Sequence, residues 1–370
     1  MLRSFFGADF RPDAALTEEN PLWIVEVNNN VWAEIRPTKT DRRLDSRWTK
    51  TLKEMMTMKN IVKKVLMMIL TMVIVSFFAF LAFQIIPGDP TTKILGADAT
   101  AEAVEALRAE LGFDRPFFVR YFEWITNALQ GDFGRSYIYD MSVAELLQGK
   151  MTVTLLLTAI AFVMIVVLSI PIGLGVASCR KAWVDRLFTV LGQIVMAVPP
   201  FFIGILLTLL CGLVLHWFNP GTFISPADDF GASIVYLLYP AFAIALPRVA
   251  MTVKMLKSSI GGEMNKDYVR TAFSRGNTRR ATLYRHVLRN AVVPTVAFLA
   301  MTAADIVAGS VIIEQVFAIS GIGRLLLTSI SNRDFPVVQA IVVILALVVV
   351  LVNFLADLIN QRLDPRLHLQ

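Results

Sequence analysis

Six long apolar stretches, separated by polar and charged segments, dominate the pattern of the chain. They run over residues 65–86, 152–178, 187–217, 234–253, 291–313 and 336–356. An α-helix rises about 1.5 Å per residue, so roughly 20 residues cross a hydrocarbon core about 30 Å thick with every backbone hydrogen bond made internally. The pattern predicts an all-α integral membrane protein with six transmembrane helices.

Prolines and isolated charges interrupt the third, fourth and fifth stretches. Pro199 and Pro200 lie near the middle of the third, and we expect them to kink it, because proline removes a helical hydrogen bond. The fourth and fifth stretches carry these interruptions: Pro240, Pro247, Arg248, Pro294 and Asp305.

Composition agrees with this pattern. Hydrophobic residues make up 56% of the chain and charged residues 17%, whereas soluble domains have about 25% charged residues. Two cysteines, Cys179 and Cys211, do not suggest a disulfide framework. The formal net charge of +6 is better explained by membrane topology than by binding to nucleic acid.

The distribution of charge predicts an orientation. The segment between the fourth and fifth stretches, 254–290, is the most basic in the chain, and the short segment before the third stretch is also basic. Segment 87–151 has more acidic than basic residues. Basic loops remain on the cytoplasmic side, so we expect 254–290 and both termini inside and 87–151 outside, with helices at 101–110 and around 117–129.

The first 57 residues differ from the rest, being charged and mixed and without a sustained period. The expected organisation is an N-terminal extension over 1–57, poorly ordered or arising from a start assigned too early, and a transmembrane domain over 58–370. A cytoplasmic docking segment is the alternative for 1–57.

Segment 254–290 predicts two short helices joined by a turn. Gly261 and Gly262 are expected to end the extension of the fourth span, and a helix then runs from about 263 to 275. Gly276 suits the left-handed conformation that closes a helix, and Asn277 or Thr278 can cap the next one. The apolar stripe of the first helix fits either the lipid headgroup layer or a groove on a soluble partner, and its spacing does not choose.

Several short motifs occur in a fixed order around the apolar stretches. They are Pro87-Gly88-Asp89-Pro90, Leu111 to Pro116 (LGFDRP), Gly131 to Ser136 (GDFGRS), Asp267 to Ala272 (DYVRTA) with Gly276, His286 to Ala291 (HVLRNA) with Pro294, Glu314 to Phe317 (EQVF), Gly321 to Arg324 (GIGR) and Leu363 to Arg366 (LDPR). In this order they resemble the dipeptide, oligopeptide and nickel family of ABC importer permeases. The resemblance covers about 58–366, and 267–276 is similar to the family's EAA loop.

The resemblance implies the type I permease arrangement, with a large external segment between the first two helices, in a bacterial inner membrane. It implies a second similar permease, two ATP-binding subunits that hold ATP and Mg²⁺, and an extracytoplasmic substrate-binding protein. The loop around 263–290 would couple the chain to an ATPase. Tyr268, Val269, Ala272 and Phe273 would seat it there, with Asp267 and Arg270 orienting it. Thr271 belongs to the same motif, and Gly276 would permit the turn.

Peptides are the best single interpretation of the substrate, with nickel or another small solute as the alternative. Phe273, Ser274 and Arg275 stand where the family commonly has Arg, Ala and Lys, and such departures leave the subfamily open.

Asp305 is placed about eight residues, or ~12 Å, from the outer end of the fifth span, where an ionised carboxylate needs water or a partner. It is either a residue of the translocation pathway or, as we favour, a carboxyl group that is neutral or paired across the permease interface. Arg248 is expected to extend toward the cytoplasm, with pairing to Asp305 as the alternative, which nothing in the linear sequence supports.

Two other classes of protein fit the sequence less well. No phosphate-binding loop of the form G-x-x-x-x-G-K-[ST] occurs, so the energy would come from a partner. An ATP-independent carrier often contains internal repeats, and the sequence shows no clear repeat, so a carrier or channel fits less well. An intramembrane enzyme would need a catalytic centre, but the three histidines lie far apart and no H-E-x-x-H motif occurs. The chain is therefore expected to be non-catalytic, with no metal or cofactor of its own.

Overall fold

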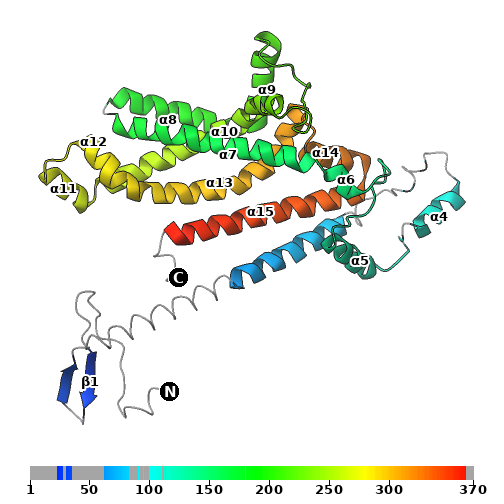
Figure 1. Ribbon diagram of the computed structural model, residues 1–370, viewed down its shortest axis with the longest axis horizontal. Helices are drawn as coiled ribbons and strands as arrows, with labels where there is room; N and C mark the ends of the chain where they lie inside the picture. The colour runs from blue at the N-terminus through cyan, green and yellow to red at the C-terminus, as the bar shows by residue number, and fades with distance from the viewer. Residues whose placement is uncertain are drawn as a thin grey trace. The chain divides into compact units, whose positions relative to one another are not determined.

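The computed structural model describes residues 23–27, 31–35, 62–82, 91, 95, 100–110, 112, 114–179 and 181–363 (Figure 1). The chain divides into two compact units, Met1–Met67 and Met68–Gln370. The motifs expected at 87–90 and 363–366 lie largely outside the described residues.

A β-hairpin occupies part of the N-terminal unit. Strands β1 (Trp23–Val27) and β2 (Val31–Ile35) pair antiparallel, with Trp23 opposite Ile35. These ten residues fall in the N-terminal extension, for which the sequence predicted no regular element; the β-branched and aromatic residues of both segments favour strands. The remainder of 1–57 lies outside the described residues.

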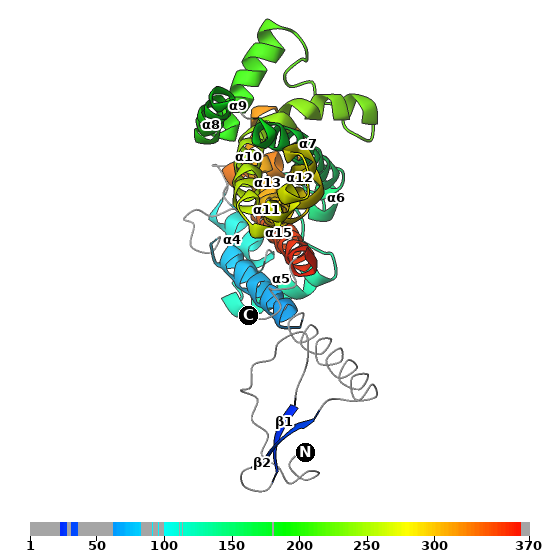
Figure 2. The ribbon, with the colours of Figure 1, turned by 90° about the vertical axis from the view of Figure 1, so that its left-hand side faces the viewer.

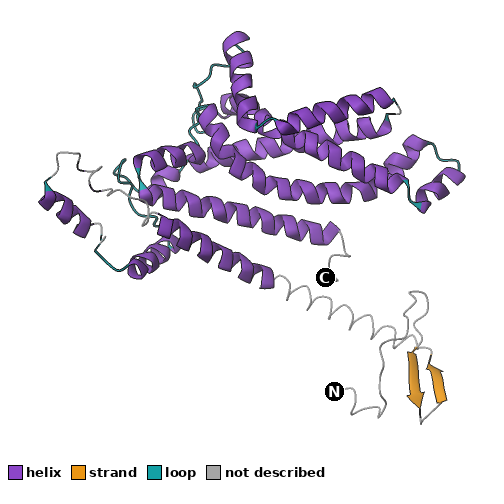
Figure 3. Cartoon of the chain, turned by 180° about the vertical axis from the view of Figure 1, so that it is seen from behind, coloured by secondary structure: helices purple, strands orange, loops and turns teal. Residues whose placement is uncertain are grey.

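The second unit is built from long helices, as Figure 3 shows by its colouring. Among the described residues, five helices are long and apolar enough to cross a membrane, or six if one bent pair counts as a single span. The five are Val62–Ala82, α7 (Lys150–Ser178) with the short α6 (Val143–Leu147) before it, α10 (Phe230–Met264), α13 (Leu288–Val316) and α15 (Phe335–Leu363).

The third predicted span is broken rather than kinked. Helix α8 (Ala182–Ala197) is followed by α9 (Pro200–Leu207) and the π-helix η1 (Thr208–Val214), and the two parts are bent by 96°. Val198 and Pro199 have extended backbone angles, since a residue that precedes proline is driven out of the helical region. Two successive prolines thus stop α8 and start α9, a larger effect than the expected kink.

Helix α10 continues further than the sequence suggested. It runs through Gly261 and Gly262 and ends at Met264, so the expectation that the glycine pair stops it is wrong. Glycine lowers helix propensity by only about 1 kcal/mol, which the packing of the preceding turns can offset. Pro240 and Pro247 lie inside the helix and do not end it.

The core of the unit lies between α7, α10 and α13. Leu157, Ile165, Leu237 and Ile306 are fully or almost fully buried there. Near the other end of α7, a Cβ at Gly173 would lie 2.8 Å from Leu256, so α7 and α10 approach closely only because position 173 lacks a side chain. This packing holds the three helices as one body.

The segment before α7 contains α4 (Ala101–Glu110) and α5 (Phe117–Leu129), as predicted. Figures 1 and 2 show α5 beside the end of the first span. Beyond α10 the chain forms α11 (Asp267–Ser274), α12 (Arg279–Thr282) and the π-helix η2 (Leu283–Val287), and α14 (Ile322–Asn332) follows α13. In Figure 1, α11 and α12 lie at one end of the helices and α6 and α14 at the other.

Candidate functional site

The loop 254–290 is anchored by buried apolar side chains on one face of α11. Val269 is 1% exposed and belongs to one small core with Leu256, Ile260 and Leu283, which lie on α10 and η2. Ala272, three positions along and therefore on the same face of the helix, is 6% exposed. The core fixes α11 against its own chain.

The burial of Val269 and Ala272 bears on the expected contact with a partner. Both side chains are covered within this chain, and their role in seating the loop on another subunit stays a prediction. The exposed members of the motif are Asp267, Arg270, Thr271 and Phe273, and Tyr268 is half-buried. Sequence periodicity identified the apolar stripe but could not tell whether its own chain or a partner covers it.

The exposed face of α11 carries two opposite charges. Arg270 Nη1 lies 3.6 Å from Asp267 Oδ1, and both side chains are at least 80% exposed. An ion pair this open to solvent contributes little to stability. Both charges therefore remain available to a partner.

A capped turn joins α11 to α12. Gly276 has a φ of +80°, its N–H donates to the carbonyl of Phe273 at 2.9 Å, and the N–H of Asn277 donates to that of Ala272 at 3.2 Å. These two bonds are the Schellman motif, which satisfies the last carbonyls of a helix. Thr278 then caps α12 by accepting the N–H of Ala281 at 3.3 Å. The predicted left-handed glycine and threonine cap are both confirmed.

A polar cluster fixes α11 to its neighbours. Tyr268 Oη donates to Glu263 Oε2 at 2.7 Å, and Lys266 Nζ lies 2.5 Å from Glu263 Oε1. Burial and the hydrogen bond to Glu263 raise the pKa of Tyr268. The end of α10 and α11 are thereby tied together, a role that the sequence did not reveal for Glu263.

An ion pair joins α10 to α13 within the apolar stretches. Arg248 Nη1 lies 3.1 Å from Asp305 Oδ2, with side chains 29% and 58% exposed. The expectation that Arg248 extends toward the cytoplasm is not met, because the arginine is held by a carboxylate on the neighbouring helix. The pair lies within one chain, and Asp305 is open at the surface of the helical unit rather than enclosed in its core.

A fully buried carboxylate organises the turn between α13 and α14. Glu314 accepts the hydroxyl of Thr154 on α7 at 2.5 Å and the backbone N–H groups of Gly323 and Arg324 at 2.7 and 3.2 Å. Thr154 in turn accepts the N–H of Ile322 at 3.0 Å. Carboxyl oxygens at a helix N-terminus accept N–H groups that have no partner within the helix, so Glu314 holds the start of α14.

The glycines of the same turn have a steric reason. A Cβ at Gly321 would collide with the Glu314 carboxylate, and one at Gly323 would collide with the backbone of Val311. Arg324 Nη1 also donates to the carbonyl of Ala318 at 2.7 Å. The motifs EQVF and GIGR therefore form a single hydrogen-bonded turn. From the sequence alone they were recognisable only as two separate family motifs.

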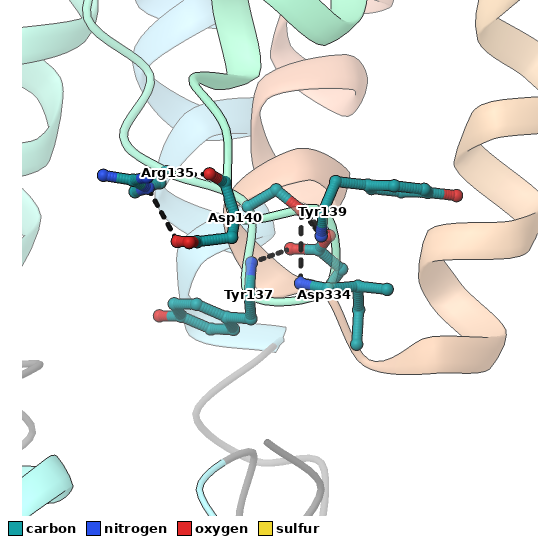
Figure 4. A network of polar contacts seen from close by, with 7 residues as sticks. Arg135, Tyr137, Tyr139, Asp140 and Asp334 are labelled. Carbon is teal, nitrogen blue, oxygen red and sulfur yellow. Dashed lines mark hydrogen bonds and ion pairs between the residues drawn. The ribbon is translucent and has the colours of Figure 1, made fainter. Parts of the chain in front are cut away.

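A second buried carboxylate, Asp334, holds the loop that precedes α6 (Figure 4). It accepts the hydroxyl of Ser136 and the N–H of Tyr137, the latter at 3.1 Å. Ser136 Oγ accepts the N–H of Tyr139 at 3.0 Å. Asp334 is 0% exposed and immediately precedes α15. The GDFGRS motif is thus bound to the residue that precedes α15.

The side chains of Tyr137 and Arg135 lie at the edge of this cluster. Burial, with Asp334 nearby, raises the pKa of Tyr137 to about 12 although Arg120 opposes the shift. Arg135 Nε lies 2.8 Å from Asp140 Oδ1 on the exposed side of the loop. We refer to Ser136, Tyr137 and Asp334 as the Asp334 clasp.

Within the described part of the chain, no group of three or more His, Cys, Asp or Glu side chains is placed to hold a metal ion. The arrangement instead provides a rigid, charged loop at one end of the helices, an ion pair at an apolar depth, and two buried carboxylates that fix the other end.

Known protein families match most of the chain from residue 56 onward. The family model described as "Binding-protein-dependent transport system inner membrane component" matches residues 169–369, and its N-terminal companion matches 56–158. A Brucella suis permease assigned to a peptide transport system is 34% identical over 308 residues, covering 83% of this chain and 98% of the relative. The glutathione transport system permease GsiC of Salmonella typhimurium is 31% identical over 306 residues, covering 82% and 97%.

Proposed function

Because the chain belongs to the family of binding-protein-dependent transport system inner membrane components and is a multi-pass, non-catalytic permease subunit of an ABC importer, we propose that it conducts di- or oligopeptides and is driven through the loop 254–290. The peptide assignment rests on the names of its relatives, among them peptide and glutathione permeases. Nickel or another small solute is the alternative cargo.

The observation that carries the coupling proposal is the two-faced construction of α11. Its buried face is locked by Val269 and Ala272, while Asp267, Arg270 and Phe273 are exposed on the other side. A helix that is rigid toward its own chain and charged toward the outside transmits a displacement instead of absorbing it. Closure of two ATP-binding subunits would rock the transmembrane helices through this contact.

The proposed assembly contains a second permease, two ATPases that bind ATP and Mg²⁺, and an extracytoplasmic binding protein. The helices adopt the type I arrangement, with both termini and the loop 254–290 cytoplasmic and segment 87–151 external. The salt bridge between Lys257 and Asp185, at 2.5 Å, supports this orientation because it brings the two basic segments to the same end.

In the proposed pathway, Asp305 and Arg248 face the second permease across the route of the substrate. An ion pair at this depth avoids the cost of an isolated charge, yet Asp305 remains more than half exposed in this chain. A peptide carries an ammonium and a carboxylate, and each could interact with one member of the pair.

Photo-crosslinking tests the coupling contact. Benzoylphenylalanine replaces Phe273 in the native complex, and the same replacement at Phe122, which is exposed on α5 far from the loop, is the matched control. We expect the Phe273 probe to capture an ATP-binding subunit and the Phe122 probe to capture none. Capture of lipid alone at Phe273 would instead make α11 a helix of the headgroup layer.

Purification and uptake test the remaining parts. The complex purified in mild detergent should contain a sibling permease, or a second copy of this chain, and two ATPases; recovery of this chain alone would favour a carrier. Proteoliposomes that contain the complex and are supplied with the binding protein should transport labelled dipeptides on addition of ATP. Competition by a nickel chelate but not by peptides would reassign the cargo.

A further inference from the structure

Helix α5 has three distinct faces. The first packs on the first span: Tyr121 is buried and its hydroxyl lies 2.9 Å from that of Ser76, and Phe117 contacts Phe77 and Phe80 with ring centroids 5.8 and 5.4 Å apart. The second is polar and exposed, with Glu123, Thr126 and Asn127. The third is apolar and is turned away from the span.

The third face is a continuous stripe. Phe118, Phe122, Ile125 and Leu129 recur at the spacing of one helix face. Phe118, Phe122 and Leu129 are 63%, 61% and 84% exposed, and Ile125 is half-buried. Large apolar side chains in such a row are costly in water, and nothing in the described part of this chain covers them.

The depth of α5 follows from its contacts. Phe77 and Phe80 lie in the last two turns of Val62–Ala82, a helix about 30 Å long and therefore matched to the hydrocarbon core. A helix packed on those turns lies where the hydrocarbon meets the headgroups. Aromatic side chains are enriched at that depth.

The direction of α5 follows from the same contacts. Phe117, Tyr121 and Trp124, which span about two turns of α5, all contact the single ring of Phe80. Helix α5 therefore crosses the end of the span rather than running along it. A crossing helix lies near the plane of the membrane, with one face toward the acyl chains and one toward water.

The stripe is also continuous with exposed apolar surface on the first span. Phe78 on the span is 61% exposed, and its ring contacts Phe77, which contacts Phe117, which contacts Phe118. We propose that α5 is an interfacial helix whose stripe Phe118, Phe122, Ile125 and Leu129 is immersed in the acyl boundary of the membrane leaflet at that end of the first span. Arg115 and Glu123, 3.1 Å apart, lie on the water side.

Spin-label accessibility tests this placement in the purified transporter reconstituted in phospholipid nanodiscs. Cys179 and Cys211 are replaced by Ala, and single cysteines are labelled at Phe122 on the stripe, Asn127 on the polar face and Phe78 on the span. The ratio of collisions with oxygen to collisions with a water-soluble nickel chelate reports depth. We expect the Phe122 label to have a ratio close to that of Phe78 and several-fold above that of Asn127.

Two results would overturn the proposal. A Phe122 ratio equal to that of Asn127 would place the stripe in water. Shielding of the Phe122 label from both reagents would show that a protein, such as the second permease or a binding protein, covers the stripe. Leu129→Cys repeats the measurement at the end of the stripe, so a fault confined to Phe122 does not decide the outcome. Uptake does not enter the readout, so the result is independent of the proposed function.

Discussion

Thr154 on α7 donates its hydroxyl to Glu314 on α13 at 2.5 Å, across 160 positions of sequence. The carboxylate is fully buried, so each of its partners matters more than it would at the surface. Helices α7, α13 and α14 meet at this one side chain.

Replacement of Thr154 by valine should destabilise the permease by about 1–3 kcal/mol, because the buried Glu314 carboxylate and the N–H of Ile322 each lose a hydrogen bond with almost no change in side-chain volume. The midpoint of thermal unfolding of the detergent-purified complex should fall by several degrees. Thr154→Ser, which keeps the hydroxyl, should remain near the wild-type value. Equal midpoints for the valine variant and the wild type would contradict the role of this bond.

Gly321→Ala should reduce the amount of folded permease in the membrane, since the new Cβ would displace the Glu314 carboxylate from the N–H groups of α14. Overpacking of this kind costs about 1–3 kcal/mol. Gly309→Ala is the matched control, because a Cβ there meets nothing within 4 Å. Both are measured by quantitative detection in membranes and by size-exclusion chromatography; indistinguishable yields would count against the steric argument.

Gly276→Val should abolish ATP-driven uptake while the protein remains in the membrane. A β-branched residue at a φ of +80° is strained by about 1–3 kcal/mol and would distort the turn that presents α11. Gly261→Val, in a helical position with open space around its Cβ, should retain most uptake. Normal transport by the Gly276 variant would argue strongly against coupling through this loop.

Asp305→Asn should lower uptake, because it leaves the Arg248 guanidinium without its counter-charge at an apolar depth. Exchange of the two charges, Arg248→Asp with Asp305→Arg, should restore assembly if the pair acts only between the two helices. Uptake is measured at limiting and saturating peptide. Near-normal transport by Asp305→Asn at both concentrations would exclude a role in the pathway.

Alkaline pH should weaken the Asp334 clasp through Tyr137. The folded state raises the pKa of this phenol from its usual 10 to about 12. The protonated phenol therefore makes its full contribution to the free energy of unfolding below pH 10, and this contribution is lost as the pH rises toward 12. Tyr137→Phe should remove that part of the pH dependence, which amounts to at most roughly 3 kcal/mol at about 1.4 per pKa unit. Unfolding midpoints from pH 8 to 11 in detergent test this; parallel curves for the two proteins would show that another group is responsible.

Local features of the structure could be predicted from the sequence. The bounds of α4 and α5, the left-handed Gly276 and the Thr278 cap each depend on a few neighbouring residues, and all agree with the structure. The 96° break at Pro199 and Pro200 was located correctly but its size was not, because the angle depends on what each half packs against.

Contacts between helices could not be predicted in the same way. Leu155 is 44% exposed and Leu157 is fully buried, although both are leucines in one uniformly apolar helix. Where lipid replaces water, the contrast between apolar inside and polar outside disappears, and the buried face of a span leaves little trace in the sequence. The partners Thr154 of Glu314, Ser136 of Asp334 and Asp305 of Arg248 all lie far along the chain, so only the fold brings them together.

The Asp334 clasp fixes the loop before α7 to the start of α15, while the loop 254–290 lies at the opposite end of the same helices. Bodies that are pinned at one end and pushed at the other pivot. We therefore expect a displacement of α11 to separate the helices most near that loop and least near Asp334. The Asp334 clasp would then be the pivot of the movement on which transport depends.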